Sequence, residues 1–334
     1  MPVTLAEAKK NAVADLDVAV IDEFRKETAV LDSLIFDDAV NPAGGGATLT
    51  YGYRRLTAQR GAAFRAINTE YTPEHVTTTQ YFTDLAPLGG SFEVDRVIAK
   101  IGPAASGSVA LNLSQTIKAT ATKFQDSVIN GDVAVDANGF DGLDKALVGS
   151  TTEAGTTAVT DWRDFDSNPR AEHKALDAID EFLSLLDGAP TVMLGNSKVL
   201  ARVRAAARRA GMYTKNPIDD LLGPDGRPIV REQYGNLTFL DPGAKAGTNN
   251  PIIPIVTRTV GGTSTTGLTD LYAYRVGLNG FHGVSTVGGE LITTYLPDFN
   301  TPKAVKYGEV EMGPVSVALK STKAAAVLRN IRVQ

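Results

Sequence analysis

The apolar positions of the chain follow a helical repeat most clearly between about residues 106 and 130. They recur every three or four residues, in the order Val109, Leu113, Ile117, Ala121, Phe124 and Val128. This spacing places them on one face of an α-helix. Ser106 or Ser108 suits the start of the helix, and Gly131 suits its end. The sequence therefore predicts a helix roughly 33 Å long. The residues expected in its core-facing stripe are Leu113, Ile117, Phe124 and Val128.

The first 40 residues carry a second helical pattern. Thr4 followed by Glu7 forms a capping box, and apolar residues repeat at helical spacing as far as Phe24. Leu31, Leu34 and Ile35 indicate a second, short helix. Residues 41–46, with the sequence NPAGGG, then end helical structure. The pattern predicts a helical arm over about residues 1–40, joined to the body by flexible glycines.

Residues 47–90 are rich in threonine, tyrosine and arginine and alternate as strands do. Alternation is clear at Leu49, Tyr51 and Tyr53 and again over residues 76–85. Few large aliphatic residues lie between Tyr53 and Val76, so the segment cannot build a core of its own. Long two-stranded ribbons are marginally stable alone. We therefore expect a partner to cover this ribbon, or the ribbon to be poorly ordered in isolation.

Helices and short strands alternate across residues 160–265, which predicts a compact α+β lobe. One helix is expected to begin at Asn168-Pro169 and to stop at Gly188, and another to be capped by Ser197 and to end at Gly211. Buried strands are expected at 191–194 and 252–256, with a turn at 223–228. The last 60 residues are mainly strands, which we expect at 291–296, 304–310, 315–320 and 324–333.

Composition narrows the classes of protein to which the chain can belong. A length of 334 residues suits about two domains. The 43% of hydrophobic residues is enough for a sizeable core, and no run of about 18 apolar residues would span a membrane. The N-terminus lacks the apolar region of a secretory signal. The chain has no cysteine, which excludes disulfides, thiolate nucleophiles and cysteine-ligated zinc.

Charge argues against a dedicated nucleic-acid binder but not against a container for nucleic acid. The net charge is −5 and the pI is about 5.4, whereas nucleic-acid binders normally have a basic domain. A strongly basic inner wall would hold DNA through its phosphates, and a near-neutral or acidic wall avoids this. Residues 1–40 carry a net charge of −5 and residues 301–334 one of +4. These segments either meet, within a chain or between chains, or form two solvated faces.

No motif for catalysis, cofactor binding or metal binding reaches the required spacing. The three histidines, His75, His173 and His282, are far apart in the sequence. The glycines at 44–46 lack the lysine of a phosphate-binding loop, and no serine stands in a nucleophile elbow. Asp132, Asp136, Asn138 and Asp141 lack the spacing of a calcium loop. We predict no catalytic residue, no cofactor and no metal site.

One predicted helix is strongly basic. Its cations are Lys198, Arg202, Arg204, Arg208 and Arg209, with no acid between them. It is either a contact between subunits, a lining near DNA, or a solvated helix face with cations favoured near the C-terminus.

Three local patterns and the order of the predicted elements resemble the major capsid proteins of tailed bacteriophages. The patterns are Phe140-Asp141-Gly142-Leu143 after the long helix, the glycine-rich run from Leu271 to Gly289, and the closing Ala325-Ala326-Val327-Leu328-Arg329. The resemblance implies the α+β capsid fold over nearly the whole chain. Its parts would be an N-terminal arm at 1–40, an extended E-loop β-hairpin at 47–90, a P-domain at 91–159 and 291–334 with its spine helix at about 106–130, and an A-domain at 160–290.

The same resemblance implies a structural virion protein and no enzymatic activity. Subunits of this family self-assemble into hexamers and pentamers that close as an icosahedral shell around double-stranded DNA, without sequence-specific contacts. The E-loop of one subunit lies over its neighbour, and the arm reaches beneath another. A portal is a further expected partner. The shell would form in the host bacterial cytoplasm, and no membrane is expected to take part.

Arginines of the ribbon are our candidates for contacts between subunits. They are Arg54, Arg55, Arg60 and Arg65. Since the ribbon cannot order itself, its order must come from outside it, and the guanidinium fork pairs well with carboxylates at interfaces.

Two other functions are compatible with the same residues. An encapsulin-type nanocompartment shell shares the fold but encloses an enzyme, and the long E-loop and flexible arm favour the phage capsid. An α+β enzyme with an unrecognised carboxylate site is disfavoured by the few histidines and the lack of cysteine. Because the chain begins almost at once with a short arm, we expect a separate scaffolding protein instead of a fused one.

Overall fold

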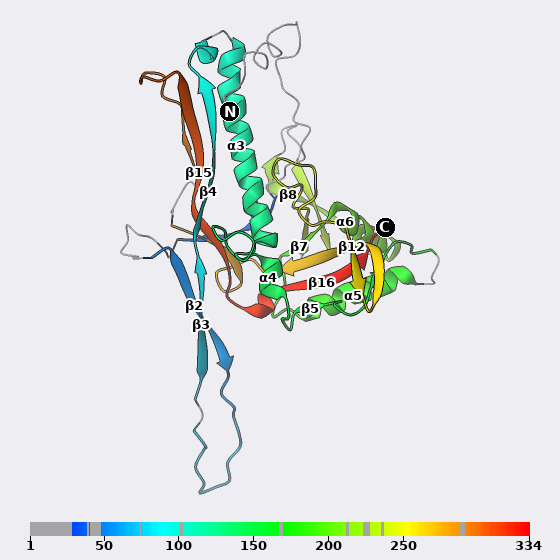
Figure 1. The fold of residues 1–334 in the computed structure, drawn as a ribbon. Coiled ribbons are helices and arrows are strands. Elements are labelled where there is room, and N and C mark those ends of the chain that lie inside the picture. The colour runs from blue at the N-terminus through cyan, green and yellow to red at the C-terminus, as the bar shows by residue number, and fades with distance from the viewer. Residues whose placement is uncertain are drawn as a thin grey trace.

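A computed structural model describes residues 29–38, 40, 48–73, 75–100, 103–166, 170–211, 214–222, 228–234, 237–286 and 291–334. The helix predicted within residues 4–24 and the glycine joint at 41–46 lie outside the described residues. Figure 1 shows three parts: a long helix against a tall sheet, a ribbon pointing the opposite way, and a lobe to one side.

The long helix, α3 (Pro103–Asn130), is the predicted one, extended by one turn at its start. Proline suits the first turn of a helix because its missing N–H would have no partner there, so the helix begins at Pro103 and not at a serine. After Asn130 the chain closes back on the helix. The N–H of Gly131 donates to Ser127 O at 2.9 Å, and the N–H of Gly142 donates to Gly131 O at 2.8 Å.

The sheet beside α3 has five strands in the order β1-β13-β15-β14, with β4 also paired to β15. The strands are β1 (Phe36–Asp37), β4 (Ala86–Asp95), β13 (Phe281–Ser285), β14 (Ile292–Tyr295) and β15 (Val305–Leu319). The strands predicted at 304–310 and 315–320 are one strand, β15. Its register against β4 shifts between Met312 and Val315. This irregularity lets a single strand continue through Gly313 and Pro314.

The short helix predicted around Leu31–Ile35 is only partly correct. Helix α2 (Ala29–Ser33) ends before Leu34, and the chain then forms β1, which pairs in parallel with β13. The backbone carbonyl of Ile35 accepts a hydrogen bond from Gly283 at 2.9 Å. Sheet pairing therefore takes over from the helix at this point, and the Ile35 side chain is left half exposed.

The lobe is built on a nine-stranded sheet with the order β5-β16-β12-β7-β10-β9-β8, to which β6 and β11 add at β16 and β12. Its strands are β5 (Glu153–Ala154), β6 (Thr160–Asp161), β7 (Val192–Gly195), β8 (Thr214–Leu222), β9 (Pro228–Tyr234), β10 (Leu237–Leu240), β11 (Val256–Val260), β12 (Thr263–Tyr274) and β16 (Ala325–Arg332). The strand predicted at 252–256 starts only at Val256, because Ile252 and Ile253 are buried in a loop.

Helices of the lobe depart from the sequence prediction at their starts. Helix α5 (Ala171–Ser184) follows Arg170, which has a left-handed backbone with φ of 62°. Helix α6 (Ser197–Arg209) is capped by the side chain of Asn196, which accepts from the N–H of Lys198 at 3.0 Å. The cap is thus Asn196 and not Ser197, the cap that the sequence predicts.

The nine-stranded sheet separates two hydrophobic cores. Along β12, Tyr272 and Tyr274 belong to the core that holds Phe124 of α3 and Leu143 of helix α4 (Leu143–Leu147). Leu271 and Ala273 belong to the other core, beneath α5 and α6. This alternation follows from the two-residue period of a strand. Strand β16 alternates in the same way, so the end of the chain lies between the two cores.

Candidate contact surfaces

The predicted ribbon is a two-stranded antiparallel hairpin that projects from the body. Strands β2 (Thr50–Ala58) and β3 (Thr77–Asp84) pair with each other in a sheet of their own. Seven of the eight residues of β3 are exposed, and Thr83 is half-buried. Exposed apolar side chains lie on the ribbon at Leu56 (57% exposed) and Phe82 (64%). Large exposed apolar patches of this kind usually mark contact sites.

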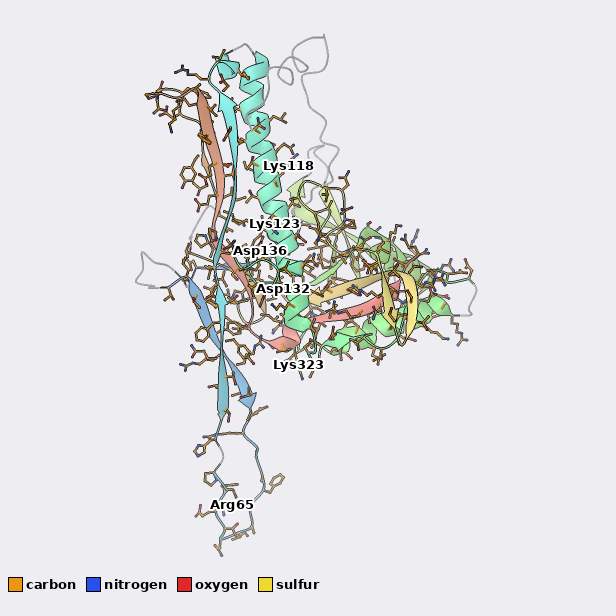
Figure 2. All side chains as sticks on the ribbon, in the orientation of Figure 1. Arg65, Lys118, Lys123, Asp132, Asp136 and Lys323 are labelled. Atoms are coloured by element: carbon orange, nitrogen blue, oxygen red, sulfur yellow. The ribbon has the colours of Figure 1, made fainter. Side chains whose placement is uncertain are left out.

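At the far end of the ribbon, the described residues 59–73 and 75–76 form no regular strand and include the most exposed apolar side chains of the described chain. Phe64 and Ile67 are essentially fully exposed, and Tyr71 is 64% exposed. Arg65 orders this tip locally, because it donates to Thr69 O at 3.0 Å and lies 5.4 Å from the ring centre of Tyr71. Figure 2 shows Arg65 at the far end of the ribbon, well away from the body.

One face of the ribbon base carries an aromatic stack with an arginine. Tyr53 and Tyr81 are directly opposite each other in the register and stack with ring centres 5.8 Å apart. The guanidinium of Arg55 lies 4.2 Å from the Tyr81 ring centre. The same guanidinium donates to two backbone carbonyls at the end of β15, Leu319 O at 2.5 Å and Lys320 O at 3.1 Å. Arg55 therefore binds its own chain.

The other predicted contact arginines are placed differently. Arg54 and Arg60 are exposed, and Arg54 lies on the opposite face of the ribbon from Arg55. All four arginines are on the ribbon, and their contact with a neighbouring chain stays a prediction. The sequence offered no signal that would separate Arg55 from Arg54, since strand register alone decides which one faces β15.

A buried cluster of polar side chains lies beside the aromatic stack. The Tyr51 hydroxyl donates to Asp37 Oδ2 at 2.9 Å, and Lys320 Nζ is 3.9 Å from the same oxygen. The ring of His282 is fully buried, 5.9 Å from the Tyr51 ring centre, with Nε2 4.0 Å from Asp37. Burial lowers the pKa of His282, and nearby Lys320 lowers it further, against the opposing effect of Asp37. Burial also raises the pKa of Tyr51.

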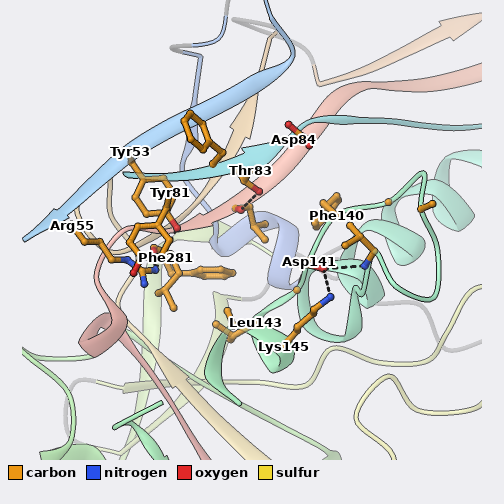
Figure 3. Close-up of a pocket in the computed structure, with 18 residues that line it drawn as sticks. Tyr53, Arg55, Tyr81, Thr83, Asp84, Phe140, Asp141, Leu143, Lys145 and Phe281 are labelled. Atoms are coloured by element: carbon orange, nitrogen blue, oxygen red, sulfur yellow. Dashed lines mark hydrogen bonds and ion pairs between the residues drawn. The ribbon is translucent and has the colours of Figure 1, made fainter. Parts of the chain in front are cut away.

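A hollow of about 590 Å³ separates the ribbon base from the segment that follows α3 (Figure 3). Tyr53, Arg55 and Tyr81 line one side of it, and Asp141 and Lys145 line the other. Lys145 Nζ is 3.0 Å from Asp141 Oδ1 and also pairs with Asp132. Asp132 and Asp141, two of the four polar residues that lack the spacing of a calcium loop, thus both pair with Lys145. This pairing fits a structural turn.

The outer face of the five-stranded sheet, away from α3, is acidic. Register places Ser91 opposite Glu309 and Glu93 opposite Tyr307, so these side chains share one face. The carboxylates on this face are Glu93, Asp95, Glu309 and Glu311, and the exposed tyrosines are Tyr295 and Tyr307. The face holds an open groove of about 330 Å³ along Gly89 to Ser91. Within β4, β14 and β15 the only cation, Lys306, points to the other face and donates to Thr301 Oγ1 at 2.8 Å.

Residues expected in the stripe of the long helix differ in burial along it. Phe124 and Val128, near its end, are buried, whereas Leu113 and Ile117, in its middle, are half-buried. Phe124 packs between Phe36 and Phe140, with both ring centres 5.9 Å away. The Phe140-Asp141-Gly142-Leu143 pattern thus supplies an aromatic partner to the helix and the first residue of α4.

A buried charge network joins the lobe to the segment after α3, and sequence reasoning missed it. Arg329 of β16 donates to Glu153 Oε1 at 2.8 Å, contacts Asp270 Oδ2 at 3.3 Å and pairs with Asp144. Arg258 donates to both oxygens of Asp270, Oδ1 at 2.6 Å and Oδ2 at 2.7 Å. The carboxylates of this network come from three separate segments of the chain, so no local spacing in the sequence could have revealed the network. Arg329 itself was noted only as part of the closing pattern.

Several side chains of the basic helix α6 make contacts within the lobe. Arg209 pairs with Asp166 at 2.5 Å, and Lys198 contacts the side chain of Gln334. Arg208 is exposed at the end of the helix. Its apolar residues Val199 and Val203 are buried in the lobe core. This arrangement favours the interpretation of α6 as a solvated helix face over a dedicated binding surface.

Within the described ranges, no group of three or more histidine, aspartate or glutamate side chains is arranged to hold a metal ion. No described helix is both long and apolar enough to cross a membrane. The surfaces that stand out are therefore the projecting ribbon and the acidic sheet face.

Comparison by sequence finds no protein-family model and no curated protein that match the chain. Comparison by structure finds clear similarity over the full length. The chain is similar to the SrpI encapsulin from Synechococcus elongatus, with 15% identity, a TM-score of 0.58, and coverage of 100% of this chain and 98% of that one.

Two capsids give similar results. The capsid of the native GTA particle has 13% identity, a TM-score of 0.57 and 97% coverage of both chains. The capsid of Myoviridae phage XM1 has 12% identity, a TM-score of 0.53, and coverage of 93% of this chain and 94% of that one. At these identities the likeness establishes the fold. The chain has the α+β fold that these phage-type capsids and the encapsulin share, as the sequence resemblance implied.

Proposed function

We propose that this chain, which has the capsid fold, is a major capsid subunit that self-assembles into the hexamers and pentamers of an icosahedral shell. In this proposal the arm is residues 1–40, the E-loop is 47–90, the P-domain is 91–159 with 291–334, and the A-domain is 160–290. The observation that carries the proposal is a pair of complementary surfaces, the basic, apolar ribbon and the acidic sheet face, at opposite ends of one molecule.

The two surfaces complement each other in charge and in chemistry. The ribbon presents Arg54, Arg60 and Arg65, against the exposed Glu70, together with exposed apolar side chains. The sheet face presents four carboxylates and two exposed tyrosines beside an open groove along Gly89 to Ser91. Such complementarity steers association and fixes its orientation. Aromatic and arginine side chains are also those that most often dominate interface energies.

The surfaces cannot meet within one chain, because the ribbon and the β4–β15 sheet extend in opposite directions from the body (Figure 1). A contact between them must therefore join different copies. Contacts between two different patches repeat head to tail, and they form rings when the rotation closes. One exposed ion pair contributes only about 0–1 kcal/mol, but in a ring every subunit repeats the contact.

A charge exchange tests this assembly directly. We expect Arg54→Glu with Arg60→Glu to abolish particles, and Glu309→Arg with Glu311→Arg to do the same, while circular dichroism of the subunit stays unchanged. Combining all four changes should restore particles, as seen by light scattering and negative-stain electron microscopy. Lys174→Glu with Arg208→Glu, two exposed cations of the lobe, is the matched control and should assemble normally.

Two results would contradict different parts of the proposal. If every variant assembles like the wild type, the ribbon does not dock on the acidic face. If the wild-type chain forms no particle or capsomer at any concentration, it is not a shell protein.

For the contents, we propose double-stranded DNA held without sequence-specific contacts, which the net charge of −5 supports. A second candidate, a nanocompartment that encloses protein, is supported by the full-length likeness to the SrpI encapsulin. Particles purified from the native source distinguish the two. Nuclease-protected DNA inside the shell supports the capsid, and a co-purifying enclosed enzyme without DNA supports the nanocompartment.

A further inference from the structure

The ribbon is attached to the body at two places along its length. The inner attachment is at its second residue pair, where the Tyr51 hydroxyl donates to Asp37 and the Thr83 hydroxyl is 3.1 Å from that of Ser316. The outer attachment is Arg55, which binds the carbonyls of Leu319 and Lys320. Arg55 lies four residues further along β2, or about 13 Å at the rise of a strand.

Two attachment points at that separation fix the direction of the ribbon relative to the body. A single attachment point would let the ribbon rotate about it. Beyond Arg55 the ribbon has no described strand partner in the body, and its residues from Leu56 to Gln80 are exposed wherever they are described. A change of angle at the base is therefore transmitted along the whole projecting length. We propose that Arg55 is a positioning residue that sets the direction in which the ribbon leaves the body.

The carbonyls that Arg55 binds are themselves held in place by the body. Leu319 is the last residue of β15 and pairs with Phe281 of β13. The backbone N–H of Lys320 donates to Gly280 O at 3.0 Å. Both Leu319 and Phe281 are buried. Arg55 thus ties the projecting ribbon to a strand end that the body holds in place, and not to another surface loop.

The arginine side chain fits this role in a way that lysine does not. The guanidinium reaches two successive carbonyls through Nε and Nη2 while its plane lies against Tyr81, and Nη2 is also 3.3 Å from the Tyr53 hydroxyl. A lysine ammonium carries its three N–H donors on a single nitrogen and has no flat face, so it cannot reproduce the two spaced contacts together with the stack.

The consequence for function rests on the proposed shell. If the ribbon of each subunit docks on the next, its direction sets the angle between neighbours. Within one ring of subunits the same angle recurs at every contact. Loss of Arg55 then does not remove the docking surfaces, but it lets subunits join at a range of angles. The expected product is particles of mixed diameter and open sheets instead of uniform shells.

Because the chain has no cysteine, two introduced cysteines can carry spin labels without background. Gln59→Cys on the ribbon and His173→Cys on α5 are both at exposed positions. The distance between the labels is measured by pulsed electron paramagnetic resonance in dilute subunits. We expect one narrow distribution for the wild type, a broad distribution for Arg55→Lys, and the broadest for Arg55→Ala. Arg54→Ala, one residue away on the opposite face, is the control and should keep the narrow distribution.

The same three variants are then assembled and their particle diameters measured by electron microscopy. Mixed diameters for both Arg55 variants, with uniform particles for the wild-type chain, support the inference. Unchanged distance distributions in both Arg55 variants overturn it, whatever the particles look like. Failure of the wild-type chain to assemble would instead contradict the proposed function, and the label distances would still report on Arg55.

Discussion

Strands β3 and β16 have the same length of eight residues and opposite environments. All but one of the residues of β3 are exposed, whereas all but one of those of β16 are buried. Strand β3 pairs only with β2 in a two-stranded ribbon, but β16 pairs with β12, β5 and β6 between two cores. The fold thus combines a stable body with an extension that the body alone does not cover.

The difference between β3 and β16 separates the residues that stabilise the fold of one chain from those that we propose act in assembly. Residues of β16 and its neighbours bury apolar surface within one chain and so determine the free energy of unfolding. Residues of the ribbon bury little in one chain, and under the proposed function they gain their energy against another chain. Substitutions in the two regions should therefore separate folding from assembly.

The largest effect is expected at Phe124, in the core that β16 helps to form. Phe124 is fully buried between two aromatic rings. Phe124→Ala should lower the free energy of unfolding by about 3–5 kcal/mol, because burial is lost and a cavity remains. Chemical denaturation of the dilute subunit measures this value. Wild-type stability would show that Phe124 does not contribute to the core as described.

A somewhat smaller loss is expected from Arg329→Leu. The change removes the cation that neutralises Glu153, Asp270 and Asp144, and the first two are largely buried. Since Asp144 remains about one third exposed, we expect a loss of about 2–3 kcal/mol. The same denaturation experiment checks it, with Arg208→Leu on the exposed end of α6 as the control. An equal response of the two variants would contradict a role for the network.

His282 should make stability depend on pH at the ribbon base. Its pKa is lowered in the folded state, mainly by burial and further by Lys320, so the unfolded chain takes up a proton at higher pH than the folded chain does. Stability is therefore full above about pH 6.5, the ordinary histidine pKa, and falls as pH drops below it towards the folded pKa.

This pH effect is measured as a difference. Unfolding free energies from pH 8 to pH 5 should fall less steeply in His282→Gln than in the wild type. His173→Gln removes an exposed histidine and should leave the wild-type slope unchanged. Parallel slopes in all three proteins would mean that His282 does not titrate in this way.

The smallest effect on folding is expected for Phe82 of β3, which has the same side chain as Phe124. Phe82 is 64% exposed. Phe82→Ala should change the unfolding free energy of the subunit by no more than about 0.5 kcal/mol. If the ribbon is a contact surface, the same variant should need a higher subunit concentration to assemble, as followed by light scattering. A large loss of subunit stability would mean that Phe82 stabilises the fold of a single chain. Phe82 and Phe124 would then not differ in the way described.

Sequence alone determined the elements whose patterns are local. The stripe through Phe124 and Val128 marked the long helix, and Asn130 ends it one residue before the predicted Gly131. Alternation over 76–85, with few aliphatic residues nearby, marked a ribbon with little core, and the order of elements was enough to suggest the fold. These features depend on residue spacing, which a sequence displays directly.

Tertiary structure alone decided which distant residues meet. Strand register put Arg55, and not Arg54, against the end of β15. Sheet pairing overrode the helical pattern after Ser33, and joined two predicted strands into β15. Arg329 gained its carboxylates from segments up to 185 residues away. Long-range pairing depends on the free energy of the whole packed chain, so no local pattern records it.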